Sequence, residues 1–145
     1  MLPDSVTSIG AAAFGDCTSL TGVFFRGNAP SSPGSVFDGS ENATVYYLAG
    51  TTGWGATFGG RPTAPWYLPN PVILALPPDF GVQTNRFGFR VSWATNASVV
   101  VDACTNLTLP TWSSVATNTL TDGWSCFTDP DWNNYPARFY RIRLP

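Results

Sequence analysis

A repeat in the first half of the chain is the feature that most restricts its fold. A shift of 23 residues places Phe14 on Phe37. Each of these phenylalanines is followed by a turn made of Gly and Asp, and then by an extended segment, residues 22–25 in the first copy and 44–47 in the second. A period in the twenties is typical of solenoids, in which each coil buries its apolar side against the next.

The first copy also carries motifs in a recognisable order. A Pro-Asp-Ser-Val-Thr-Ser-Ile-Gly run at 3–10 precedes an Ala-Phe pair at 13–14 and a Cys-Thr-Ser-Leu run at 17–20. This order resembles the BspA-type leucine-rich repeat of bacterial surface proteins, over about one and a half coils. The resemblance implies a short strand at 23–25. It also implies that several side chains point into the solenoid: Val6, Ile9, Phe14, Cys17, Leu20 and Val23.

The second copy is less regular, as expected of a terminal coil that must cover the apolar end of a stack. We expect residues 46–58 to form this cap. Thr52 is a candidate N-cap for a short helical turn over residues 53–58. Trp54 and Phe58 would then lie on one side of the turn and cover the core.

A segment rich in Gly and Pro, residues 59–65, predicts a domain boundary. The repeat end and its cap would occupy residues 1–65 and a second domain residues 66–145. Short β-branched and aromatic segments at roughly ten-residue spacing in the second half predict a small antiparallel β-sandwich. The expected strands are 72–76, 87–93, 98–104, 112–117, 124–128 and 138–144. The fold class is therefore expected to be mainly β, a short leucine-rich-repeat solenoid end followed by the sandwich.

Alternation along two of these strands predicts which side chains face the core. In residues 87–93 the aromatic and aliphatic side chains expected on one face are Phe87, Phe89, Val91 and Trp93. In residues 138–144 we expect Tyr140, Ile142 and Leu144 inside and the arginines outside.

The end of the chain carries a second resemblance. Residues 103–107 (Ala-Cys-Thr-Asn-Leu) and 129–142, which include a Tyr-Pro-Ala-Arg-Phe-Tyr-Arg-Ile run, are similar to the fibronectin-III-like modules that close large secreted bacterial proteins. The resemblance spans about residues 72–145. It implies an immunoglobulin-like sandwich with a structural or attachment role.

The charges exclude several kinds of partner. Only 11% of residues are charged, all seven basic residues are arginines, and the formal net charge is −2. Such a chain offers no basic surface to nucleic acid or to an anionic membrane. No apolar run has the length of a membrane-spanning helix, so membrane insertion is not expected.

Solubility must come from Ser, Thr, Asn and Gly, which is common in extracellular β proteins. Together with this composition, the two resemblances imply an extracellular or cell-surface bacterial protein. The residues after Met1 lack the basic and apolar regions of a signal peptide, so an export signal would lie outside this sequence.

The residue types needed for common enzyme chemistry are missing. Without histidine the chain cannot form a Ser-His-Asp or Cys-His arrangement, and without lysine it lacks amine nucleophiles. Most of its acids stand in turns, where Asp bonds to its own backbone. We expect no enzyme activity and no cofactor.

One loop carries oxygen-bearing side chains at alternate positions. Asp129, Asp131 and Asn133 have the spacing of ligands in a calcium loop. A proline intervenes, however, and Asn134 and Tyr140 stand where an EF-hand loop has Gly and Glu. A plain turn leading into the last strand is the alternative interpretation.

Aromatic residues of the second half offer a different candidate site. Trp132 and Tyr135 stand in the same loop, and Trp112 begins the expected strand 112–117. Exposed aromatic rings of this kind can stack on sugars. The alternative is that they seal the ends of the sandwich.

The three cysteines do not have metal-ligand spacing. The positions of Cys104 and Cys126 permit a disulfide between two strands of the second half. The alternative is that both are small buried apolar residues.

These observations predict a non-enzymatic structural or interaction module of a bacterial surface or secreted protein. Its partner would be another protein or a second copy of itself. The unpaired edge of the first coil could bind the next chain head to tail and build a filament. The alternative function is a carbohydrate-binding module that uses exposed aromatic residues of the sandwich.

Overall fold

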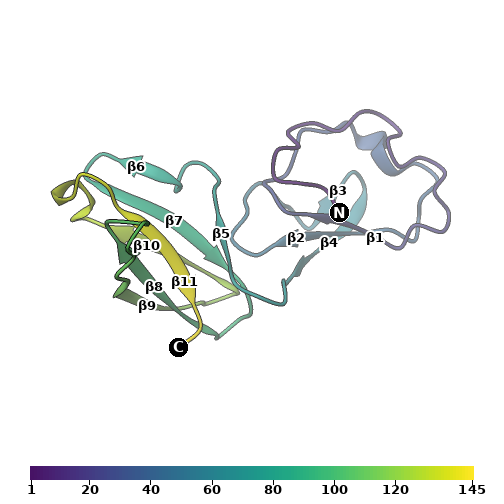
Figure 1. The fold of residues 1–145 in the computed structure, drawn as a ribbon. Helices are drawn as coiled ribbons and strands as arrows, with labels where there is room; N and C mark the ends of the chain where they lie inside the picture. Colours follow the sequence, from purple (N-terminus) through teal and green to yellow (C-terminus); the bar gives the residue numbers. More distant parts are fainter. The chain divides into compact units, whose positions relative to one another are not determined.

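The computed structural model describes residues 1–145, which divide into two compact units, Met1–Trp66 and Tyr67–Pro145 (Figure 1). Almost all regular structure is β strand, as predicted. The helices are two short 3-10 turns, η1 (Gly34–Phe37) and η2 (Trp132–Asn134). Neither turn has the length or the apolar character needed to cross a bilayer.

The first unit contains a sheet whose main strands are parallel. Its order is β1-β2-β4-β3, with β3 antiparallel to β4 and the other neighbours parallel. Gly22 lies opposite Thr44, so the chain returns to the same place after 22 residues. The strands are β1 (Gly22–Phe25), β2 (Thr44–Leu48), β3 (Thr57–Phe58) and β4 (Arg61–Trp66).

Backbone hydrogen bonds join the first two turns of the chain outside the strands as well. The amide of Ile9 donates to the carbonyl of Ser31 at 2.9 Å, and that of Phe14 donates to Val36 at 3.0 Å. Figure 1 shows these segments, in purple and blue, running side by side. We call residues 3–25 the first coil and residues 26–48 the second coil.

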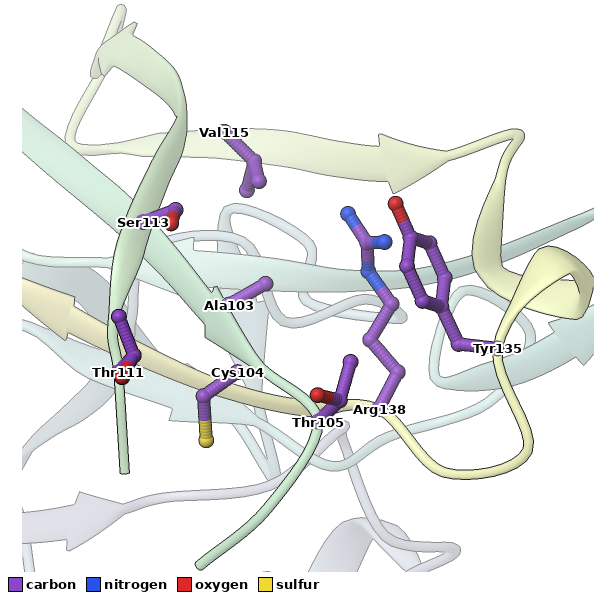
Figure 2. Close-up of a pocket in the computed structure, with 8 residues that line it drawn as sticks. All are labelled: Ala103, Cys104, Thr105, Thr111, Ser113, Val115, Tyr135 and Arg138. Atoms are coloured by element: carbon purple, nitrogen blue, oxygen red, sulfur yellow. The ribbon is translucent and has the colours of Figure 1, made fainter. Parts of the chain in front are cut away.

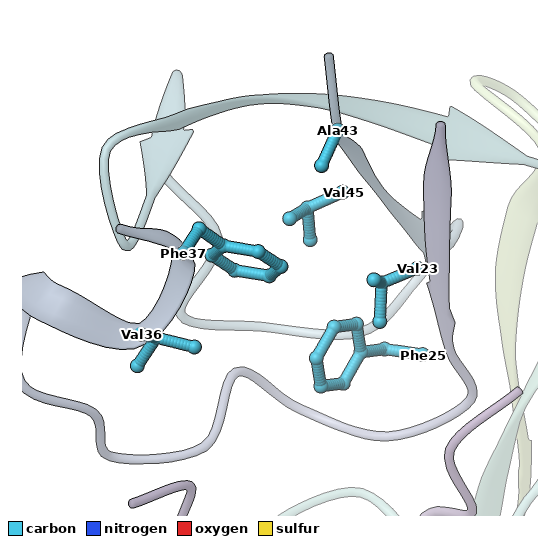
Figure 3. Close-up of a cluster of buried hydrophobic side chains, with 6 residues drawn as sticks. All are labelled: Val23, Phe25, Val36, Phe37, Ala43 and Val45. Carbon is cyan, nitrogen blue, oxygen red and sulfur yellow. The ribbon is translucent and has the colours of Figure 1, made fainter. Parts of the chain in front are cut away.

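The core of the first unit lies between β1, β2 and η1 (Figure 3). Alternation along the strands directs Val23, Phe25 and Val45 inward, where each is at most 6% exposed. The buried ring of Phe37 stacks on Phe14 with ring centroids 5.2 Å apart. Cys17, which was expected to point inward, is exposed instead and lies in the irregular segment that precedes β1.

The cap differs from its prediction. Residues 53–58 form no helix, and Thr52 is not an N-cap; the chain instead makes the short hairpin of β3 and β4. Gly59 and Gly60 turn this hairpin with φ of 56° and 80°, a region that favours glycine. Trp54 and Phe58 nevertheless pack against the core, as expected.

The second unit contains two antiparallel sheets, as a β-sandwich-like fold requires. One sheet has the order β10-β7-β5, with β6 also paired to β7; the other has the order β11-β8-β9. The strands are β5 (Val72–Leu74), β6 (Gly81–Gln83), β7 (Arg86–Ser92), β8 (Ser98–Cys104), β9 (Ser113–Thr119), β10 (Trp124–Asp129) and β11 (Phe139–Arg143).

Both sheets contribute to one apolar cluster. Phe89 and Val91 of β7 meet Val99 and Val101 of β8, and all four are at most 1% exposed. The face predicted for residues 87–93 is confirmed, because Phe87 and Trp93 pack on the same cluster. The cluster is completed by Leu120 and Phe127, with Tyr140 and Ile142 packed against it.

Candidate functional site

The candidate site of the second unit is a group of pockets around Arg138, the residue that immediately precedes β11. This side chain borders pockets of about 220, 240 and 210 Å³. The loop after β10, with the turn η2, and the ends of β8 and β9 supply much of the other walls, and Val82 of β6 and Phe87 of β7 also border the 240 Å³ pocket. The sequence pattern did not identify Arg138 as a candidate site residue.

The arginine is held by a buried carboxylate. Nε of Arg138 lies 2.7 Å from Oδ2 of Asp129, whose side chain is 5% exposed. The hydroxyl of Tyr140 donates to the same oxygen at 2.8 Å, and the amide of Asp131 donates to Oδ1 at 2.9 Å. Both oxygens of Asp129 are therefore engaged inside the protein.

Tyr135 covers one face of the same guanidinium. Its ring centroid lies 4.2 Å from Cζ of Arg138, within the range of a cation–π contact. Burial acts to lower the pKa of Arg138, but the hydrogen bond to Tyr135 and the charge of Asp129 outweigh it, and the pKa is raised. Burial and the hydrogen bond to Asp129 raise the pKa of Tyr140. Arg138 thus stays charged and Tyr140 stays protonated at neutral pH.

The arginines of residues 138–144 were all expected outside, and this prediction is wrong for Arg138. Arg141 and Arg143 do lie outside, with side chains 47% and 44% exposed. Arg138 is only 12% exposed, because it shares the parity of Tyr140 and Ile142 rather than that of the other two arginines. Leu144, which was expected inside, lies beyond the end of β11 and is 49% exposed.

The structure does not bring the calcium candidates together. Asp129 and Asp131 border one pocket, but Asn133 does not. Asp129 is already neutralised by Arg138 and bonded by Tyr140. No group of three or more acidic, cysteine or histidine side chains is placed to hold a metal ion. The alternative interpretation, a turn leading into the last strand, describes this loop.

Two of the three aromatic candidates share a pocket. Trp132 of η2 and Tyr135 border the 240 Å³ pocket together with Phe87 and Tyr140. Trp112 lies elsewhere, with its ring 4.4 Å from the guanidinium of Arg141.

That second arginine belongs to a separate polar cluster on the β11-β8-β9 sheet. Asp102 accepts hydrogen bonds on Oδ2 from Arg141 (3.0 and 3.1 Å) and Arg143 (3.1 Å), and on Oδ1 from Ser114 (2.9 Å). Burial acts to raise the pKa of Asp102, but these donors and the charge of Arg143 lower it overall. The guanidinium of Arg141 lies over the ring of Trp112, which places Trp112 beside this cluster.

Cys104 and Cys126 form no disulfide. Cys104 is buried in β8 and Cys126 is exposed on β10, and these strands belong to different sheets. Cys104 thus fits the alternative interpretation of a small buried apolar residue, and Cys126 fits neither interpretation. Cys17 is free as well.

No protein-family model matches the chain, no curated protein is similar to it, and no solved structure matches its fold. The resemblances to BspA-type repeats and to fibronectin-III-like modules therefore rest on the sequence motifs alone.

Proposed function

We propose that this chain is an extracellular structural module of a bacterial surface or secreted protein, and that it associates with a second copy through the open side of its first coil. The first unit would be the end of a BspA-type leucine-rich-repeat solenoid, and the second a fibronectin-III-like attachment module. A surface with little charge and the two sequence resemblances support this location and role.

The observation that carries the proposal is a difference in burial between equivalent residues of the two coils. Phe14 is partly exposed, whereas Phe37 is 1% exposed. Leu20 is likewise partly exposed, whereas Ala43 is 1% exposed. The second coil is covered by the first, and no other coil of the first unit covers the first in the same way. A coil of the same shape is the natural cover for such a surface.

The opposite end of the first unit is closed. Trp54 packs on Phe25 and Phe58 with ring centroids 5.0 and 5.3 Å apart, and the hairpin of β3 and β4 completes that end. A filament requires an open surface at both ends of each copy. We therefore replace the head-to-tail filament with a pair of copies that join their open sides, since such a contact closes on itself.

Two substitutions in the first coil test this proposal. Ile9→Asp introduces a charge among the partly buried apolar residues, and Ser19→Asp adds the same charge at an exposed position of the same coil. Sedimentation velocity should give pairs for the parent chain and for Ser19→Asp, and single chains for Ile9→Asp. Pairs that persist in a folded Ile9→Asp variant would refute the proposed surface.

Glycan binding is a second candidate function, supported by the shared pocket of Trp132 and Tyr135. Partly exposed aromatic rings beside polar side chains are suited to the apolar faces and hydroxyls of sugars. Loss of binding to a polysaccharide panel in a folded Trp132→Ala variant would support this function. Failure of the parent chain to bind any member of the panel would end it.

A further inference from the structure

We propose that the 220 Å³ pocket beside Arg138 binds the carboxylate of an acidic sugar, such as a uronic acid residue at the end of a glycan. The inference rests on the second candidate function, glycan binding, and is independent of the pairing of coils. Figure 2 shows the pocket, with the guanidinium of Arg138 and the hydroxyl of Tyr135 at one end.

Arg138 has donors to spare for a ligand. A guanidinium carries five N–H groups in a planar fork. Nε lies beside Asp129, and the ring of Tyr135 covers one face of the guanidinium. The remaining terminal N–H groups belong to a side chain that borders the pocket. A planar fork of this kind matches the two oxygens of a carboxylate.

Asp129 fixes this arginine without occupying the pocket. Its carboxylate forms an ion pair with Arg138 and accepts hydrogen bonds from the hydroxyl of Tyr140 and the amide of Asp131. It does not border the 220 Å³ pocket, which lies on another side of Arg138. Asp129 is therefore a positioning residue, and the ligand would approach the guanidinium from the 220 Å³ pocket, which Asp129 does not border.

The other walls suit a sugar better than a purely apolar acid. Thr105, Thr111 and Ser113 border the pocket and bring hydroxyl groups that can bond to sugar hydroxyls (Figure 2). Tyr135 is 42% exposed, and its ring offers an apolar face or edge. A volume of about 220 Å³ is below the range of roughly 300–1,000 Å³ for drug-sized ligands. This size favours a single terminal sugar residue.

The test compares two sugars that differ only in the carboxylate. Nuclear magnetic resonance titration of the intact chain would use a disaccharide ending in glucuronic acid and its counterpart ending in glucose. We expect the acidic sugar to bind at least about tenfold more tightly, in line with the strength of charge-assisted hydrogen bonds. Arg138→Lys, which keeps the charge and loses the fork, should abolish most of this preference. Arg26→Lys, at an exposed position of the other unit, should retain it.

Further outcomes distinguish binding of an acidic sugar from glycan binding in general. Tyr135→Phe removes one partner of Arg138 and should weaken the acidic sugar selectively, which keeps the test valid if Arg138→Lys does not fold. Equal affinity for both sugars would overturn the inference and leave glycan binding intact. Acetate binding as tight as that of the acidic sugar would overturn the assignment to a sugar. Binding of neither sugar would remove the inference, and the polysaccharide panel would then decide glycan binding itself.

Discussion

Asp102 illustrates how single residues stabilise the second unit. Its side chain is 3% exposed, yet it keeps its charge because Ser114, Arg141 and Arg143 donate hydrogen bonds to it. A buried carboxylate without such donors would bind a proton instead. The pKa of Asp102 is lowered in the folded chain. Its contribution to stability is therefore complete above the unfolded-state pKa of about 4 and is lost as the pH falls through the lower folded value.

The lowered pKa of Asp102 leads to a prediction about unfolding in acid. Asp102→Asn should be less stable than the parent chain at neutral pH, because a neutral amide cannot replace the charge between two arginines. The variant should also lose less stability than the parent chain as the pH falls below about 4. Urea unfolding at a series of pH values measures both effects. Asp4→Asn, at an exposed position, is the control, and an unchanged acid response in Asp102→Asn would contradict the assignment.

The burial of Phe37 leads to a second prediction, about the stability of the first unit. Phe37 is 1% exposed and stacks on Phe14. Phe37→Ala would leave a cavity in the core of the first unit, and should cost about 3–5 kcal/mol in the free energy of unfolding. Phe80→Ala removes a ring that is 46% exposed and should cost much less. Similar losses in urea unfolding of the two variants would show that Phe37 is not a core residue.

At the scale of elements, a buried serine ties the first coil to the second. Ser40 is fully buried; its hydroxyl donates to the carbonyl of Phe14 at 2.6 Å and accepts from the amide of Cys17 at 2.8 Å. Both backbone groups belong to the turn in which the first coil changes direction. The side chain thus satisfies polar groups that neither coil could satisfy by itself.

Loss of this hydroxyl should loosen the stacking of the coils. Ser40→Ala leaves the amide of Cys17 and the carbonyl of Phe14, which lie in a partly buried place, without this partner, at a cost of about 1 kcal/mol. Ser32→Ala, at an exposed position of the second coil, should be nearly neutral. Hydrogen exchange at the amide of Cys17 would locate the effect, since that amide loses its acceptor. Protection that does not change in Ser40→Ala would contradict this role.

Elements with a strong local pattern could be predicted, and elements that depend on distant partners could not. Alternation or β-branched residues identified β2 and β8. By contrast, the Gly and Pro residues of 59–65 indicated a break, although β4 (Arg61–Trp66) pairs there with β2. The pairing of two segments far apart in sequence overrode the local signal. The same limit applies to the site, because only the fold brings Arg138 beside Asp129 and Tyr140.

At the scale of the whole molecule, the two units divide the proposed roles between them. The first carries the partly exposed apolar coil, and the second carries the Arg138 pocket and the Asp102 cluster. Substitutions in the coil should therefore change association and leave sugar binding intact, and substitutions at Arg138 should do the reverse. Measurement of both properties in Ile9→Asp and Arg138→Lys checks this independence. A variant that loses both while it stays folded would contradict it.

The most direct test of the proposed association is the mass of the parent chain in solution, measured by light scattering over a wide range of concentration, with electron micrographs of the same samples. We expect a mass that rises from that of one chain to that of two chains and then stays constant. Single chains at the highest concentration would contradict association through the first coil. A mass that keeps rising, with filaments in the micrographs, would contradict the closed pair and restore the head-to-tail arrangement.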